Sequence, residues 1–180
     1  MLVSLGGNCA ITYHLNQYNL RKEAYPFDWC KITINQLINV LINDFNGYEN
    51  IKIKKLSENH LKEGKPSYIL YNKYNITFAH EVSKLDKIYD FKNSLVKRIE
   101  RFRNLINPTF IRLELNNVKN IGVYNNLIDI LDKIFINYKF ILVSKNNPNN
   151  TKINWIKLED FSEDWKYTNI NWFDILHNYD

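Results

Sequence analysis

The sequence predicts an α/β fold: one domain over residues 1–180, with a mainly parallel central sheet flanked by helices and a β-hairpin before the longest helix. Short apolar segments typical of buried strands alternate along the chain with longer segments whose apolar residues recur at helical spacing. No linker rich in Ser, Gly or Pro divides the chain. Its 180 residues are enough for one sizeable core.

The chain begins with a pattern that predicts a strand, a turn and a helix. Residues 2–5 are an apolar run typical of a buried strand, and Gly6-Gly7 predicts a tight turn after it. Asn8 is a suitable N-cap for a helix over residues 9–20. A second helix, rich in Ile and Leu, is expected over residues 33–44.

A β-hairpin is expected in the middle of the chain. Residues 67–71 and 75–79 are both rich in β-forming residues, and they flank the short stretch Asn72-Lys73-Tyr74. The polar residues 46–66 before the hairpin match neither the strand pattern nor the helix pattern.

The second half of the chain alternates helices with strands. The longest helix opens at Ser83, with Asp86 as a capping-box-like partner, and Asn107-Pro108 stops its apolar stripe. The expected elements are a helix over 83–106, a strand over 109–115, a helix over 123–136, strands over 138–144 and 153–158, and a short helix over 171–177.

Composition excludes several classes of protein. The chain is 45% hydrophobic with only 5 Gly and 4 Pro, which excludes collagen-like and Gly/Pro-rich disordered chains. No apolar run approaches the roughly 18 residues that span a bilayer, and the first residues lack the features of a signal peptide. Two cysteines predict no disulfide framework. We therefore expect a cytoplasmic protein without a membrane span.

The net charge of +5 has a plain origin. The chain contains 19 Lys beside 28 Asn and 23 Ile, all residues with A/T-rich codons, which indicates an A/T-rich genome. The lysines are scattered, and short clusters such as residues 52–55 lack a recognisable binding motif. Nucleic acid is therefore not expected as a partner.

Cys9 is the strongest candidate for a catalytic residue. It lies at the junction of a strand and a helix, where the sites of open α/β sheets gather. The helix dipole and unpaired backbone N–H groups lower a thiol pKa there, and the same N–H groups can stabilise an oxyanion. Gly6, Gly7 and Asn8 would form this turn. The alternative is an ordinary cysteine that acts as a small buried hydrophobic residue.

A nucleophilic cysteine needs a base, and His80 is the best placed of the four histidines. It follows an expected strand, where a side chain can project into a site. His14 is five residues after Cys9, about 140° round the helix axis, which is a poor position for reaching the thiol. His60 lies in a polar stretch, and His177 fits a terminal amphipathic helix.

Residues 25–29, Tyr-Pro-Phe-Asp-Trp, are the second unusual segment, because the proline prevents continuation of the preceding helix. As an anchored loop, the segment would bury Phe27 and Trp29 and would hydrogen-bond Asp28 to backbone. As part of a site, it would supply a carboxylate or an aromatic wall. The residues alone favour the anchored loop, and the next residue, Cys30, is expected to be a buried thiol.

These segments together form a recognisable pattern. Residues 4–9 have the form S-x-G-x-N-C, Leu20-Arg21 follows a helix, residues 26–29 read P-F-D-W, and His80 follows a later strand. In this arrangement the chain resembles a family of uncharacterised proteins described as papain-like cysteine peptidases. The resemblance implies Cys9 as nucleophile, His80 as base and Asp28 as an orienting carboxylate. A papain-type fold pairs a helical half with a β-barrel half, which differs from the α/β pattern here.

A second set of residues is similar to another family. Gly7-Asn8-Cys9 follows the first strand, and Asp174 and His177 have the spacing D-x-x-H near the C-terminus. This arrangement resembles the GDSL-type esterases, or SGNH hydrolases, with Cys in place of Ser and Asn in place of Asp. It implies a three-layer α/β sandwich with Cys9, Asp174 and His177 as the catalytic residues.

The sequence thus predicts a cysteine hydrolase or a related thiol acyl-transfer enzyme. Its substrate would be a peptide, an isopeptide, an ester or a glycan-linked acyl group. The alternatives are an SGNH-like esterase and an inactive module that binds a glycan or a protein. No cofactor is expected, because the G-G-N-C turn lacks the nucleotide-binding patterns. No metal is expected, because the two cysteines are 21 residues apart and form no ligand grouping.

Overall fold

A parallel four-stranded sheet lies at the centre of the fold, which confirms the predicted α/β class. The strand order in this computed structural model is β1-β6-β7-β8, and each neighbouring pair is parallel. The bounds are Leu2–Ser4 (β1), Thr109–Glu114 (β6), Lys139–Ser144 (β7) and Ile153–Lys157 (β8). The structure describes residues 1–55, 68–78, 85–116, 118, 120–159, 162 and 164–179.

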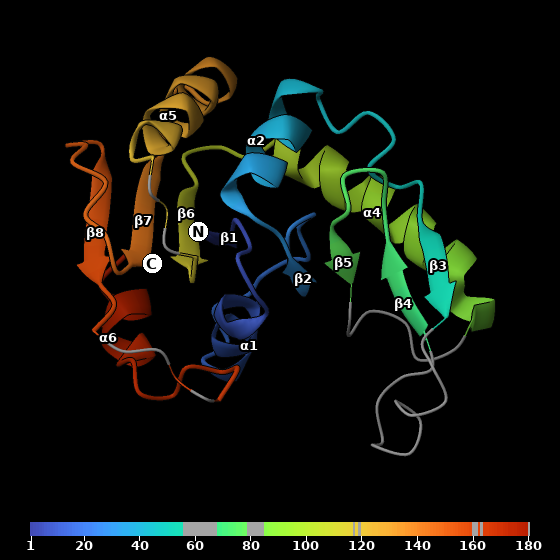
Figure 1. The fold of residues 1–180 in the computed structure, drawn as a ribbon, viewed down its shortest axis with the longest axis horizontal. Helices are drawn as coiled ribbons and strands as arrows, with labels where there is room; N and C mark the ends of the chain where they lie inside the picture. The colour runs from blue at the N-terminus through green and yellow to red at the C-terminus, as the bar shows by residue number, and fades with distance from the viewer. Residues whose placement is uncertain are drawn as a thin grey trace.

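Helices cover both faces of this sheet (Figure 1). Side chains of β6 alternate between the faces: Ile111 and Leu113 pack with α1 and α6, whereas Phe110 packs in the cluster that includes α2, α4 and α5. Burial on both faces explains why these strands are continuous apolar runs in the sequence. The helices are Ala10–Gln17 (α1), Ile34–Ile42 (α2), Ile88–Arg103 (α4), Gly122–Ile134 (α5) and Trp172–His177 (α6).

A small antiparallel sheet lies beside the parallel one, in front of α4 in Figure 1. Its order is β2-β5-β4-β3, with bounds Cys30–Lys31 (β2), Thr77–Phe78 (β5), Tyr68–Tyr71 (β4) and Lys52–Lys55 (β3). The β4–β5 pair confirms the predicted hairpin. The side chain of Asn72 stabilises its turn, because Oδ1 accepts from the backbone N–H groups of Tyr74 and Ile76 at 3.0 and 3.2 Å.

Two strands of the small sheet were not predicted from the sequence. β3 lies within the polar residues 46–66, where the lysines on either side of Ile53 hide the strand pattern. β3 is an edge strand, a position where lysines are common because they discourage pairing with another chain. β2 has only two residues, which is too short to produce a periodic signal.

Four helices end two or three residues earlier than predicted: α1, α2, α4 and α5. α1 stops at Gln17 and not at Leu20, because Asn19 adopts a left-handed conformation with φ of 58° and the N–H of Leu20 bonds back to the carbonyl of Leu15. α4 ends at Arg103 and begins at Ile88, after a 3₁₀ turn over Leu85–Lys87. The predicted cap at Ser83 lies outside the described residues.

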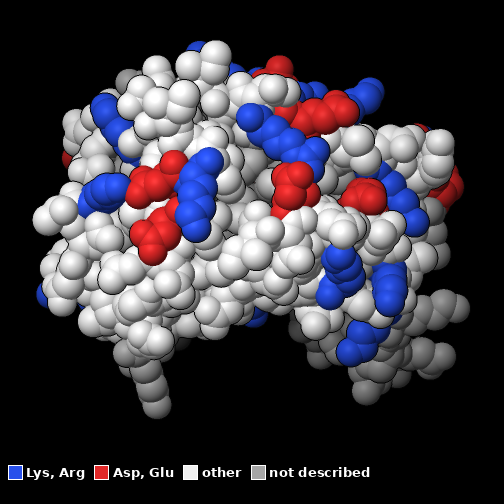
Figure 2. Space-filling model, turned by 90° about the horizontal axis from the view of Figure 1, so that it is seen from above, with Lys and Arg blue, Asp and Glu red and all other residues white. Residues whose placement is uncertain are grey.

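Opposite charges are interleaved on the surface. Figure 2 shows Lys and Arg beside Asp and Glu over much of the face seen there. The exposed ion pairs of the described residues include Arg103 with Asp44 and Lys152 with Asp132. Among the described residues, no helix combines the length and the apolar character needed to cross a membrane.

The turn from β1 to α1 depends on glycine. Gly6 and Gly7 have φ values of 73° and 104°, which side chains other than hydrogen rarely allow. A Cβ on Gly6 would collide with the Ile32 side chain, and a Cβ on Gly7 would collide with the backbone carbonyl of Leu113 in β6. The turn therefore lies directly against the carboxyl end of the neighbouring strand.

We predict that Gly7→Ala lowers the free energy of unfolding by about 2–4 kcal/mol, because it adds positive-φ strain and a clash with backbone that cannot move aside. Urea denaturation followed by circular dichroism measures this difference. Gly122→Ala is the matched control, since its Cβ would meet only the Asn120 side chain and should change stability by less than about 1 kcal/mol. Equal effects of the two substitutions would contradict the prediction.

Candidate active site

Cys9 lies where the sequence predicts it, at the start of α1 and just beyond the carboxyl end of β1. It is the N-cap residue, and its carbonyl accepts the first helical hydrogen bond, from the N–H of Tyr13 at 3.0 Å. The side chain of Asn8 supplies the capping acceptor, because Oδ1 accepts from the N–H of Ala10 at 2.9 Å. Cys9 itself is partly exposed, so its thiol is placed at a helix N-terminus with access to solvent.

A buried ion pair lies next to the Gly6-Gly7 turn. The Arg112 guanidinium and the Glu114 carboxylate, both on β6, are 2.7 Å apart and almost fully buried. Arg112 also donates to the carbonyls of Leu5 and Ile32, at 2.9 and 3.0 Å. The second Glu114 oxygen accepts from the backbone and side-chain nitrogens of Asn116. Arg112 thus joins the residue before the glycine turn to the residue after β2.

An open cleft of about 510 Å³ lies at the same edge of the sheet, between the starts of α2 and α5. Glu114 contributes to its wall at the end of β6, and amide side chains dominate the remainder. The lining residues are Thr33, Ile34, Asn35, Glu114, Asn116, Val118, Asn120, Val123 and Asn126. Carboxyl ends of parallel strands are the usual place for ligand sites in α/β folds.

Asp28 is buried and hydrogen-bonded, as the anchored-loop interpretation expects. Its Oδ2 accepts from the Arg21 guanidinium and from the N–H of Tyr25, and its Oδ1 accepts from the Thr12 hydroxyl at 3.2 Å. Burial raises the pKa of Asp28, and the positive charge of Arg21 and the hydrogen bonds oppose that rise. These contacts connect the loop to α1, one turn after Cys9.

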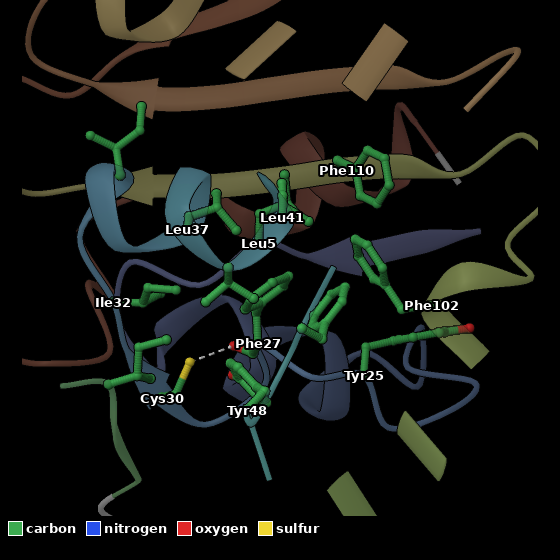
Figure 3. Close-up of a cluster of buried hydrophobic side chains, with 14 of the residues drawn as sticks. Leu5, Tyr25, Phe27, Cys30, Ile32, Leu37, Leu41, Tyr48, Phe102 and Phe110 are labelled. Carbon is green, nitrogen blue, oxygen red and sulfur yellow. Dashed lines mark hydrogen bonds between the residues drawn. The ribbon is translucent and has the colours of Figure 1, made fainter. Parts of the chain in front are cut away.

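The residues on either side of Asp28 anchor the loop in the core. Phe27 is fully buried and meets the rings of Phe45 and Phe102 at centroid distances of 5.6 and 5.5 Å. Figure 3 shows the buried Cys30 in the same cluster, where its thiol donates to the carbonyl of Phe27 at 3.2 Å. Trp29 is only half-buried, with a φ of 53°, so the expectation that it is buried was only partly correct.

The histidines fall in different places. His80, the predicted base, lies outside the described residues, as does His60. The last described residue before His80 is Phe78, which pairs with Cys30. His177 is exposed, its Nδ1–H donates to the Phe173 carbonyl at 2.9 Å, and its ring is stacked on the Phe173 ring.

The structure does not bring His177 to Cys9. The His177 ring meets the ring of Tyr18, the residue that follows the last turn of α1, at 5.9 Å. Cys9 is nine residues away, at the other end of that helix, which corresponds to about 13 Å along the axis. Asp174, the other residue of this alternative set, accepts from the Asn171 side chain at 2.6 Å.

His14 is buried inside the molecule. Its Nε2 is 2.7 Å from the carbonyl of Lys166, and its ring stacks on Trp172 with centroids 5.1 Å apart. Nδ1 is buried and has no hydrogen-bond partner. Burial lowers the pKa of His14, although the bond to Lys166 opposes this, so the ring is held in its neutral form with Nε2–H as the donor.

Comparison with known proteins identifies the family of this chain. A family model described as "Putative papain-like cysteine peptidase (DUF1796)" matches residues 1–158. The chain belongs to this family. It is also similar to the uncharacterized protein R408 of Acanthamoeba polyphaga mimivirus, with 29% identity in a match that covers 99% of this chain and 97% of the relative.

The extent of the family match separates the two sets of candidate residues. Cys9, Asp28 and His80 lie inside the region that this papain-like peptidase family shares. Asp174 and His177 lie beyond it. Within the described part of the chain, no three or more His, Cys, Asp or Glu side chains are grouped in a way that would hold a metal ion.

The sequence did not reveal every residue that shapes this site. The Arg112–Glu114 pair was missed, although two charged residues at alternate positions of an otherwise apolar strand are a signal of a buried pair on one face. Arg21 was part of the recognised pattern, but its pairing with Asp28 was not foreseen, and Thr12, the other side-chain partner of Asp28, gave no distinctive signal.

We predict that Asp28→Asn lowers the free energy of unfolding by about 2 kcal/mol. The amide nitrogen of the new asparagine would face an N–H or O–H donor from which the carboxylate accepts a hydrogen bond in the native chain. Asp44→Asn is the control, since Asp44 is an exposed partner of Arg103 and should cost less than about 1 kcal/mol. Chemical denaturation at pH 7 measures both. If the two variants were equally stable, Asp28 would not anchor the loop.

We also predict that stability falls below about pH 6.5 through His14. Because the folded-state pKa is lowered, the unfolded chain binds a proton first as the pH falls. The stabilisation is complete above pH 6.5 and declines with a limiting slope of about 1.4 kcal/mol per pH unit. Urea denaturation between pH 7.5 and pH 5 should show a smaller decline for His14→Gln than for the native chain. His177→Gln, at an exposed position, should leave the slope unchanged.

Proposed function

We propose that this protein is a cysteine-dependent acyl-transfer enzyme, and specifically a peptidase or related hydrolase, with Cys9 as its nucleophile. The observation that carries the proposal is the position of Cys9: partly exposed, at the N-terminus of α1 and at the carboxyl end of β1. Membership of a family described as papain-like cysteine peptidases supports the same chemistry.

The surroundings of Cys9 suit a thiolate and an oxyanion. The positive end of the α1 dipole favours a negative charge on sulfur, and the backbone N–H groups of Asn8 and Cys9 are our candidates for the donors that would stabilise a developing oxyanion. The glycine turn lets a substrate approach the backbone here, because Gly6 and Gly7 present no side chains. The buried Arg112 fixes the carbonyl of Leu5, just before this turn.

The proposed reaction has two steps. The Cys9 thiolate attacks the substrate carbonyl carbon, the bond to the amine or alcohol breaks, and the leaving group takes a proton from an imidazolium. Water then attacks the thioester and gives a proton to the imidazole. The carbon–sulfur bond breaks, the acid product leaves, and the thiolate and the imidazolium are regenerated. The attacked bond is thus that of a peptide, an isopeptide or an ester.

His80 is our candidate for the base, and Asp28 for a positioning residue. His80 lies within the family match and follows the end of β5 by two residues in the sequence. Phe78, the last residue of β5, pairs with Cys30, and Cys30 lies close to Gly6 in the glycine turn. Asp28 acts through Thr12, because that hydrogen bond holds the P-F-D-W loop against the helix that presents Cys9. Asp28 differs in this role from a carboxylate that orients the imidazole directly.

The SGNH-like alternative has one observation in its favour. The helices on both faces of a parallel sheet form the three layers that this resemblance implies. It would require His177 to serve Cys9 from the opposite end of α1. The architecture therefore suits this alternative, whereas the position of His177 at the far end of α1 counts against it. We therefore keep His80 as the candidate base.

We predict that Cys9 reacts with iodoacetamide with an apparent pKa clearly below the free-thiol value of about 8.5, and that the buried Cys30 reacts slowly. His80→Ala should raise this pKa or slow the reaction about tenfold or more, because the imidazolium no longer stabilises the thiolate. Mass spectrometry of the two cysteine peptides at several pH values measures each rate.

His177→Ala is the matched control and should leave the Cys9 profile unchanged. Sensitivity to His177 and not to His80 would support the SGNH-like alternative. Alkylation of Cys9 no faster than Cys30, with neither histidine important, would contradict the enzyme proposal and favour a binding module.

A further inference from the structure

A short turn near the C-terminus lies against the start of α1. Residues 164–167, which we call the α1 strap, fold into a turn in which Asp164 accepts from the N–H groups of Lys166 and Tyr167, through its side chain and its backbone carbonyl. Tyr167 is buried, and its carbonyl accepts from the Trp172 indole at 2.8 Å. The strap is therefore held by the packed C-terminal segment.

Three contacts join the strap to α1. The His14 Nε2–H donates to the Lys166 carbonyl at 2.7 Å. The Lys166 ammonium lies 4.9 Å from the centroid of the Tyr13 ring, and the Trp165 ring meets the Tyr13 ring edge-to-face at 5.5 Å. These contacts fix both the backbone and the side chains of the strap relative to the helix.

The strap brings Trp165 beside Cys9. Tyr13 is four residues after Cys9 and so lies on the same face of the helix, one turn further along. Asn8, the residue before Cys9, directs its Nδ2 to the Trp165 carbonyl at 3.5 Å. The residues that flank Cys9 along the chain and along the helix face thus both contact Trp165.

The Trp165 side chain is unusual because it stays 44% exposed beside a candidate nucleophile. A large aromatic ring that is held by its neighbours and still open to solvent offers an apolar surface at low entropic cost. The Lys166 ammonium lies 5.8 Å from the centroid of the Trp165 ring and stabilises the position of the ring as a cation–π partner.

We infer that Trp165 binds the substrate, and that the enzyme prefers acyl compounds with an aromatic or large apolar group next to the attacked carbonyl. This inference rests on the proposed role of Cys9. The indole would pack against the apolar group while the carbonyl lies at the N-terminus of α1. Trp165 is thus a specificity-determining residue, supplied by a segment more than 150 residues away in the sequence.

Two alkylating reagents of the same reactive group test this inference. Iodoacetanilide carries a phenyl ring on the amide nitrogen, and iodoacetamide does not. We expect the ratio of their Cys9 alkylation rates to exceed the ratio for glutathione. Trp165→Ala should reduce this ratio about 3- to 10-fold, towards the glutathione value, because it removes one aromatic contact. Trp165→Phe should keep the ratio within about twofold of the native chain.

Phe173→Ala is the matched control. Phe173 is similarly exposed, at 52%, but contacts Tyr18 at the other end of α1, so its loss should not change the ratio. A native ratio equal to that of glutathione, or a ratio unchanged by Trp165→Ala, would overturn the inference. The intrinsic reactivity of the thiol affects both rates equally, so it cancels in the ratio. The ratio therefore tests Trp165, whereas the pH profile with iodoacetamide tests the activation of Cys9.

Discussion

The contacts of one buried side chain, Arg112, hold the candidate site together. Its guanidinium binds Glu114 on its own strand, the carbonyl of Leu5 after β1 and the carbonyl of Ile32 after β2. An unpaired guanidinium would be very costly in this interior, so the carboxylate and both carbonyls are needed together. Arg112 is therefore a constraint on geometry as much as a source of stability: it fixes the glycine turn relative to both sheets.

The two family motifs have a structural reason to occur together. The G-G-N-C turn presents Cys9 at the start of α1, and the P-F-D-W loop holds that helix through the hydrogen bond between Asp28 and Thr12. Phe27 secures the loop in the aromatic core, and the Tyr48 hydroxyl donates to the Pro26 carbonyl at 2.8 Å. The first motif thus supplies the candidate nucleophile, and the second holds the element that carries it.

Local patterns explain which parts of this structure the sequence could predict. The buried strands and the hairpin were predicted because their residues interact mainly with near neighbours or with a uniformly apolar interior. β3 was missed because Lys52, Ile53 and Lys54 are all exposed in this edge strand, so the sequence shows no apolar run there. The helix ends were displaced because a single residue in a left-handed conformation, such as Asn19, ends a helix that its apolar spacing would continue.

The site depends on longer-range contacts, and these explain what the sequence left hidden. Cys9 was identifiable because a glycine turn before a helix is a local feature. The placement of Trp165 follows from the packing of His14 against Lys166 and Trp172, more than 150 residues later in the chain, and no local pattern encodes it. The separation of His177 from Cys9 likewise follows from the packing of α6 on the far end of α1.

The architecture of this chain differs from that of papain, although its family is described as papain-like. A papain-type enzyme is built from a helical half and a β-barrel half, whereas this chain has a parallel sheet between helices and a small antiparallel sheet beside it. What the proposed chemistry requires is a thiol at a helix N-terminus and an imidazole within reach. Here the parallel sheet positions the helix, through β1 and the glycine turn. The antiparallel sheet leads the chain towards His80, because β5 pairs beside Cys30 next to that turn. The likeness to papain that we propose therefore concerns two side chains, Cys9 and His80, and not the scaffold. Alkylation of the His80 variant tests this proposal directly.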